Sequence, residues 1–159
     1  MRLSAGLHRD FIHLSLENLI TRPGELDVLG SPVDLSGVTV DGYIVAGLTH
    51  HIIPWENAYQ STQLLGGRPR FVLSTSGHIQ ALVNPPSKES RSSYRLAEQY
   101  PASPDDWTQQ AVTKPGSWWV DYGEWLAPRS GQLKPAPKRL GGGRYKAQAK
   151  APGSYVHAS

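Results

Sequence analysis

The chain has 159 residues, the length of one ordinary domain, and it contains no cysteine. The missing thiols exclude a disulfide framework, a thiolate metal site and a cysteine nucleophile within this sequence. Its formal net charge of +3 arises in residues 128–159, which hold seven Lys or Arg and no Asp or Glu, whereas residues 1–127 hold nine basic and thirteen acidic residues.

The N-terminal part predicts a helix followed by a short hairpin. Residues 7–20 carry apolar side chains at mostly helical spacing, which favours a helix. Residues 25–35 read "ELDVLGSPVDL", with a turn signal at Gly30-Ser31-Pro32, and predict a hairpin or two connecting strands. The first residues lack the apolar stretch of a signal peptide, and no apolar run reaches the ~20 residues of a membrane span, so we expect a cytoplasmic protein.

A strand, a helix and a second strand are predicted next. Residues 38–48 are rich in β-branched and aromatic side chains, and their nearly continuous apolar run suggests burial on both faces, as in a parallel sheet. Pro54 suits the start of a helix that Gly66-Gly67 ends. Residues 70–74 form the next apolar strand, so this region predicts a βαβ unit.

The remainder alternates polar and aromatic stretches. Residues 87–104 predict a loop with some helix around 92–99, and residues 103–111 predict a helix that Ser103 caps. Residues 117–131 predict a helix with an aromatic stripe on one face, formed by Trp118, Tyr122, Trp125 and Leu126. This stripe could pack in the core or at an interface, or bind an aliphatic ligand. Beyond Pro128 the chain is rich in Gly, Pro and Lys, and we expect little regular structure.

Histidines follow both strands of the predicted βαβ unit. His50 and His51 stand where the first strand ends, and His78 follows the second. In an α/β-hydrolase-like site the acid follows one late strand and the histidine follows the next, so His78 is a candidate general base. Gly77 would let the backbone turn tightly before it. An incidental loop histidine is the alternative.

Two parts of such a site are missing. The sequence has no Gly-x-Ser-x-Gly or Gly-x-Cys-x-Gly elbow, and the acid position holds His50. A neutral imidazole there can accept a hydrogen bond from His78 but cannot stabilise an imidazolium by charge. The adjacent histidines suggest a metal only weakly, because neighbouring side chains at a strand end point to opposite sides and no third ligand is placed. We therefore expect no metal and no cofactor.

Five segments carry a resemblance to a known family. In chain order they read "LHRDF", "GYIVAGLTHHIIPWENAYQSTQLLGG", "RFVLSTSGHIQALVNPP", "SWWVDYGEWLAPRSG" and "APGSYVH". Together they resemble the C-terminal part of polyhydroxyalkanoate synthases, closest to the class that polymerises medium-chain 3-hydroxyacyl units. The resemblance covers nearly the whole chain, with its motifs in the family's order.

The resemblance implies a fold and a partial site. The fold is α/β, the C-terminal portion of an α/β-hydrolase-like domain with its last strands and helices over residues 1–127, and a disordered basic tail over 128–159. His78 matches the family's catalytic histidine, His51 matches the histidine after its aspartate, and His50 takes the aspartate's place. The family's cysteine elbow lies upstream of the matched segments. Glu56, on the helix after His51, is a candidate substitute acid.

The resemblance also implies partners. The family acts on 3-hydroxyacyl-CoA and a growing polyester chain stored in cytoplasmic granules. We expect a synthase segment that is not catalytic alone, with an upstream synthase segment or a full-length synthase as partner. The alternatives are a non-catalytic module that binds granules or synthase, and a chain that completes another subunit's site. The basic tail could bind an anionic surface or be a solvated extension, and no nucleic acid is expected.

Overall fold

The computed structural model describes residues 3–139 and 141–157. The chain divides after Leu126 into two compact units, which are described separately. None of the helices within the described ranges is long and apolar enough to cross a membrane.

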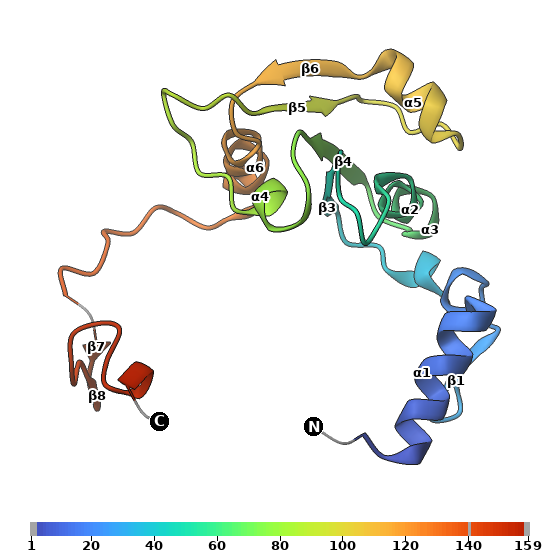
Figure 1. Ribbon diagram of the computed structural model, residues 1–159, viewed down its shortest axis with the longest axis horizontal. Coiled ribbons are helices and arrows are strands. Elements are labelled where there is room, and N and C mark those ends of the chain that lie inside the picture. The colour runs from blue at the N-terminus through green and yellow to red at the C-terminus, as the bar shows by residue number, and fades with distance from the viewer. Residues whose placement is uncertain (1–2, 140, 158–159) are drawn as a thin grey trace. The chain divides into compact units, whose positions relative to one another are not determined.

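The first unit begins with a helix and a hairpin, as predicted (Figure 1). Helix α1 spans Ala5–Glu17, and the Ser4 hydroxyl caps it by accepting a hydrogen bond from the Leu7 N–H at 3.3 Å. A 3-10 turn follows, then an antiparallel hairpin, then a second 3-10 turn: η1 (Leu19–Thr21), β1 (Leu26–Val28), β2 (Ser31–Val33) and η2 (Leu35–Gly37).

A four-stranded sheet is the centre of this unit. Its strand order is β3-β4-β5-β6, with bounds Gly42–Gly47, Pro69–Ser74, Ser93–Leu96 and Val112–Pro115. Strands β3 and β4 are parallel, and two short helices connect them, α2 (Trp55–Tyr59) and α3 (Ser61–Leu64). The predicted βαβ unit is therefore confirmed. The other two strand pairs are antiparallel, so the protein is mixed α/β with a mixed sheet.

One sequence expectation for this sheet was wrong, and the expected burial of β3 was met in part. The segment predicted as loop with some helix contains strand β5, because Tyr94 is buried and packs with Val72 on β4. Strand β6 follows helix α5 (Pro104–Gln110), which Ser103 caps as predicted. Strand β3 is covered on both faces, with Ile44 packing on one side and Tyr43 and Val45 on the other, but only Ala46 and Gly47 are fully buried.

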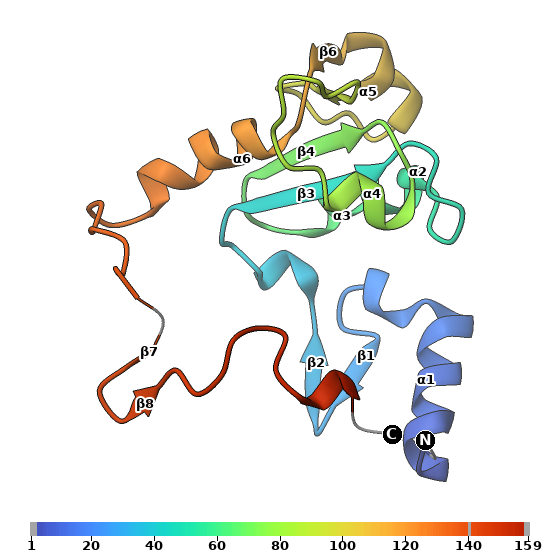
Figure 2. The ribbon, with the colours of Figure 1, turned by 60° about the vertical axis from the view of Figure 1, so that its left-hand side comes forward.

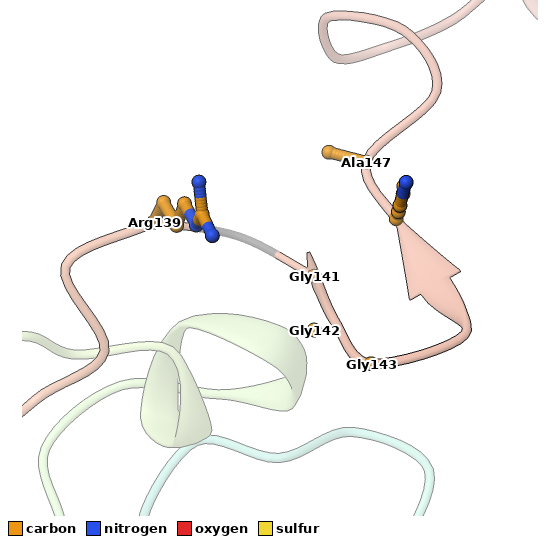
Figure 3. Close-up of a pocket in the computed structure, with 6 residues that line it drawn as sticks. Arg139, Gly141, Gly142, Gly143 and Ala147 are labelled. Carbon is orange, nitrogen blue, oxygen red and sulfur yellow. The ribbon is translucent and has the colours of Figure 1, made fainter.

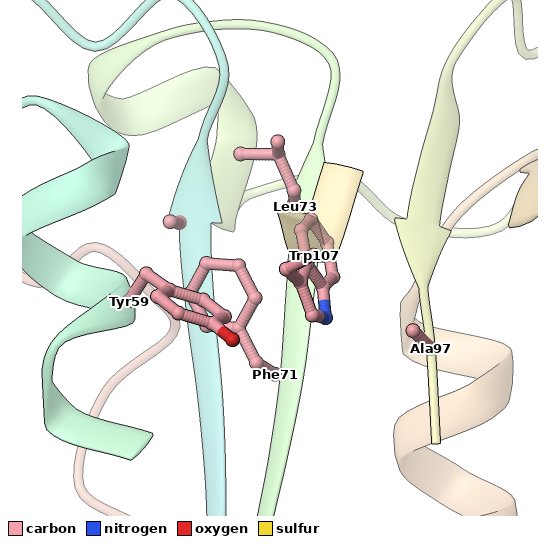
Figure 4. Close-up of a cluster of buried hydrophobic side chains, with 6 residues drawn as sticks. Tyr59, Phe71, Leu73, Ala97 and Trp107 are labelled. Carbon is pink, nitrogen blue, oxygen red and sulfur yellow. The ribbon is translucent and has the colours of Figure 1, made fainter. Parts of the chain in front are cut away.

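Side chains from alternate positions of β4 build a core on each face of the sheet. Phe71 and Leu73 pack with aromatic side chains from α2 and α5, Tyr59 and Trp107 (Figure 4). On the other face, Val72 packs with Tyr94 and Trp118. Helix α6 (Trp119–Leu126) follows Trp118 (Figure 2). Its aromatic rings contact Tyr43 of β3. The aromatic stripe is thus mainly a packing surface.

The second unit holds little regular structure. Its described residues form two 3-10 turns and a hairpin of two-residue strands: η3 (Ala127–Arg129), β7 (Gly141–Gly142) with β8 (Tyr145–Lys146), and η4 (Tyr155–His157). An open cavity of about 400 Å³ lies at this hairpin (Figure 3), and the residues that line it are Arg139, Gly141, Gly142, Gly143, Lys146 and Ala147. Most side chains in this unit are exposed. Disorder of the tail stays a prediction.

Candidate active site

The backbone between β4 and the next helix brings His78 back toward β3. Helix α4 spans His78–Leu82, and both Ser76 and His78 have positive φ, at 111° and 44°. Gly77 itself is extended, with φ −118°. It must be glycine for a different reason from the one expected: a Cβ there would lie 2.4 Å from the carbonyl oxygen of Thr49. Close approach to the loop after β3 therefore selects this glycine.

The structure brings the three predicted histidines together. The ring centroids of His50 and His78 are 5.0 Å apart, and His51 lies 5.5 Å from His78 and 6.1 Å from His50. The expectation that His50 and His51 point to opposite sides was wrong, because their rings stack with an interplanar angle of 21°. Strand β3 has ended at Gly47, whose carbonyl accepts from the His50 N–H, so strand alternation no longer applies.

His50 is held by the loop that follows it. Its Nδ1 accepts hydrogen bonds from the backbone N–H groups of Ile52 and Ile53, at 3.3 and 3.0 Å. Its Nε2 lies 3.3 Å from Nδ1 of His78. Which of these two nitrogens donates depends on the tautomers of the two rings, so a hydrogen bond from His78 to His50 stays a prediction.

Among the described residues, Glu56 does not bond to the histidines and no metal-ligand set is found. Glu56 is exposed on α2, and in the part of the chain that the structure describes it makes no ion pair or side-chain hydrogen bond with His50, His51 or His78. Across residues 3–139 and 141–157, no group of three or more His, Asp or Glu side chains could hold a metal ion. The cluster is therefore built from imidazoles alone.

An apolar cavity adjoins two of the histidines. It has a volume of about 190 Å³. His50 and His78 contribute to its wall, and the remaining lining side chains are apolar: Val45, Ala46, Ile53, Ala58, Ala81 and Leu82. Gly47 belongs to the lining as well, and a Cβ there would lie 2.7 Å from the Ser76 carbonyl oxygen. The cavity could accept a short aliphatic group beside the imidazoles.

Helix α4 is held at its other end by residues that sequence reasoning missed. The indole N–H groups of Trp118 and Trp119 donate to the carbonyls of Ala81 and Leu82, at 2.8 and 2.9 Å. The Ser117 hydroxyl donates to the Asn84 carbonyl. A helix of one turn is not stable alone, and its last carbonyls lack partners within the helix. These three consecutive donors therefore help to hold the helix that begins with His78.

A buried ion pair anchors the segment that carries these donors. Asp121 of α6 is buried and accepts hydrogen bonds from Arg70 Nε and the Tyr43 hydroxyl, both at 2.8 Å, and from Arg70 Nη2. Burial alone would raise the pKa of Asp121, but the hydrogen bonds from Arg70 and Tyr43 outweigh it and hold that pKa below its usual value. Burial and the Asp121 carboxylate both raise the pKa of Tyr43.

Fold and site together define a mixed α/β protein with a histidine cluster at the carboxyl ends of two parallel strands. No protein-family model matches the chain. It is 42% identical to poly(3-hydroxyalkanoate) polymerase 1 of Ectopseudomonas oleovorans over 98% of its length, covering 28% of that protein. It is 44% identical to the poly(3-hydroxyalkanoate) polymerase subunit of Cupriavidus necator over 92% of its length, covering 25% of that relative.

A more distant polymerase subunit, from Rhizobium etli, is 32% identical over 98% of the chain. The chain is homologous to the poly(3-hydroxyalkanoate) polymerases and corresponds to a C-terminal segment of them, which confirms the resemblance seen in its motifs. It spans about a quarter of the length of the relatives it matches.

Proposed function

We propose that this chain provides the histidine part of an acyl-transfer site of the polymerase type, within an α/β-hydrolase-like arrangement. In that chemistry a cysteine thiol gives its proton to a histidine and attacks the thioester of 3-hydroxyacyl-CoA, and CoA leaves. One observation carries the proposal. His78 follows β4 and lies 3.3 Å from His50, which follows the parallel neighbour β3. Side chains at the carboxyl ends of neighbouring parallel strands are where such folds hold their chemistry.

The chain is inactive when it is alone. Covalent acyl transfer needs a nucleophile beside the base, and this sequence has neither a cysteine nor a Gly-x-Ser-x-Gly elbow. Incubation of the isolated chain with 3-hydroxydecanoyl-CoA and a thiol reagent is expected to show no CoA release above background. Release that His78→Ala abolishes would contradict this part of the proposal.

Fusion to the N-terminal part of a related polymerase, which carries a Gly-x-Cys-x-Gly elbow, tests the site directly. We expect weak CoA release from the fusion, loss of that release in His78→Ala, and a gain of roughly 10- to 10³-fold in His50→Asp, within the range of general-base effects. A Glu56→Gln fusion is the matched control, and it should keep the unmodified rate. Full activity of the His78→Ala fusion would refute the role of His78.

A second candidate function rests on a different surface. Leu82, Trp118, Trp119 and Tyr122 line an open apolar depression of about 400 Å³. Such a surface suits a module that binds polyester granules or a full-length synthase in the cytoplasm. Co-sedimentation of the chain with polyester particles would support this function if Trp119→Ser lowers binding and Trp55→Ser, on the other face of the sheet, does not. Equal binding by both variants would count against it.

A further inference from the structure

The direction of the hydrogen bond between His50 and His78 follows from the backbone around His50. Ile52 and Ile53 direct their N–H groups at Nδ1 of His50, at 3.3 and 3.0 Å. A backbone N–H group can only donate, so this Nδ1 must carry a lone pair. A neutral imidazole has one N–H, and that proton must then be on Nε2. An imidazolium at position 50 would set its own Nδ1–H against both backbone donors.

The position of the proton on His50 also bears on the tautomer of His78. Nε2 of His50 lies 3.3 Å from Nδ1 of His78. We propose that His50 donates this Nε2–H to His78 and thereby fixes His78 as the tautomer with its proton on Nε2. Two N–H groups facing each other would be the alternative, and it would leave both donors without an acceptor at this contact.

This arrangement is the reverse of what a general base needs. In a serine-protease triad, the carboxylate holds Nδ1–H of the histidine, which leaves the lone pair on Nε2 to take the proton of the nucleophile. With His50 as donor, His78 presents an N–H at Nε2. That N–H suits a hydrogen bond to a carbonyl or carboxylate oxygen beside the apolar cavity. In this tautomer Nε2 has no lone pair to take a thiol proton, so only the minor tautomer of His78 can act as the base, which accounts for the weak CoA release expected of the fusion. His50 is thus a positioning residue that acts through His78.

Nuclear magnetic resonance of the full chain tests the tautomer directly. A histidine-labelled sample at about pH 8, where an ordinary imidazole is neutral, gives separate nitrogen signals for a protonated and an unprotonated ring nitrogen. We expect His78 and His50 each to show one fixed tautomer, with the proton on Nε2. The exposed His13 of α1 provides the averaged reference in the same spectrum. A His78 with its proton on Nδ1, or averaged like His13, would overturn the proposal.

Two matched substitutions add a second readout. His50→Asp should move the proton of His78 to Nδ1, because a carboxylate can only accept. His51→Asp adds the same charge one residue away and should leave the His78 tautomer unchanged. If both variants move the proton equally, charge and not the directed hydrogen bond sets the tautomer, and the proposal is wrong. The NMR measurement of the tautomer does not require acyl transfer, but the effect of the tautomer on catalysis rests on the proposed function. A fusion whose CoA release is unchanged by His78→Ala, together with an Nε2 proton on His78 in the spectrum, would refute the proposed function and leave the tautomer proposal standing.

Discussion

Asp121 is the residue whose replacement tests most directly how the segment behind the histidine cluster is held. Asp121→Asn keeps the size of the side chain and removes its charge. The carboxyl is buried and accepts two hydrogen bonds from Arg70 and one from Tyr43. Breaking a fully buried ion pair costs about 3–5 kcal/mol. The Arg70 side chain is 33% exposed and can turn to water, so we expect a loss of about 2–3 kcal/mol in the free energy of unfolding.

Urea unfolding followed by tryptophan fluorescence measures this loss. Tyr43→Phe removes one of the three hydrogen bonds and should cost about 1 kcal/mol. Asp105→Asn is the matched control, because Asp105 is exposed in the first turn of α5 and contributes only a few tenths of a kcal/mol there. A loss in Asp121→Asn no larger than that in Asp105→Asn would refute the assignment of Asp121 as the anchor of α6.

The same carboxyl gives a pH dependence with a defined sign. The pKa of Asp121 is lower in the folded protein than its ordinary value of about 3.9. The unfolded chain therefore binds more protons in that range, and the stabilisation is complete above the ordinary pKa and is lost as pH falls through the lowered one. Acid unfolding should begin below about pH 4, and Asp121→Asn should weaken its pH dependence.

Three further predictions concern the neighbourhood of His78 and the tail. Trp118→Phe removes the buried donor to the Ala81 carbonyl, and we expect a loss of about 1–3 kcal/mol in urea unfolding together with a changed His78 nitrogen spectrum; an unaltered spectrum would contradict the role of this contact. Gly77→Ala should lower the free energy of unfolding by about 1–3 kcal/mol, because the added Cβ would lie 2.4 Å from the Thr49 carbonyl oxygen. Wild-type stability would contradict this, because it would show that the loop after β3 moves aside without cost. Limited trypsin digestion should cut the tail first, after Lys138 or Arg139, and earlier cleavage within the sheet would refute this.

Much of the fold could be predicted because its signals are local. The apolar runs of β3 and β4 and the helix signals between them specify a βαβ unit without reference to the rest of the chain. Strand β5 has four residues, of which only Tyr94 is buried, and such a short segment has no detectable period. Its strand conformation comes from pairing with β4 and β6, and that pairing depends on contacts distant in sequence.

The sequence was enough to predict which histidines come together, but not which residues hold the helix that carries His78. The positions of His50 and His78 after neighbouring strands were enough to place them together, and they lie 3.3 Å apart. The donors to the end of α4 come from Ser117, Trp118 and Trp119, more than thirty residues further along the chain. A local run of polar and aromatic side chains does not predict which distant carbonyl groups will accept its hydrogen bonds, so only the folded structure reveals these contacts.

Position 50 shows why a motif match alone cannot give the chemistry. The N–H groups two and three residues later point at the side chain of residue 50, a loop geometry that aspartate favours because its carboxylate accepts from such groups. An aspartate would still have acceptor capacity left for His78, since both of its oxygens accept. Histidine has one acceptor, and the loop uses it, so its other nitrogen must donate. With aspartate at position 50 this loop would support a general base, whereas with histidine there the proposed hydrogen bond runs the other way, so the two side chains would differ in hydrogen-bond direction as well as in charge.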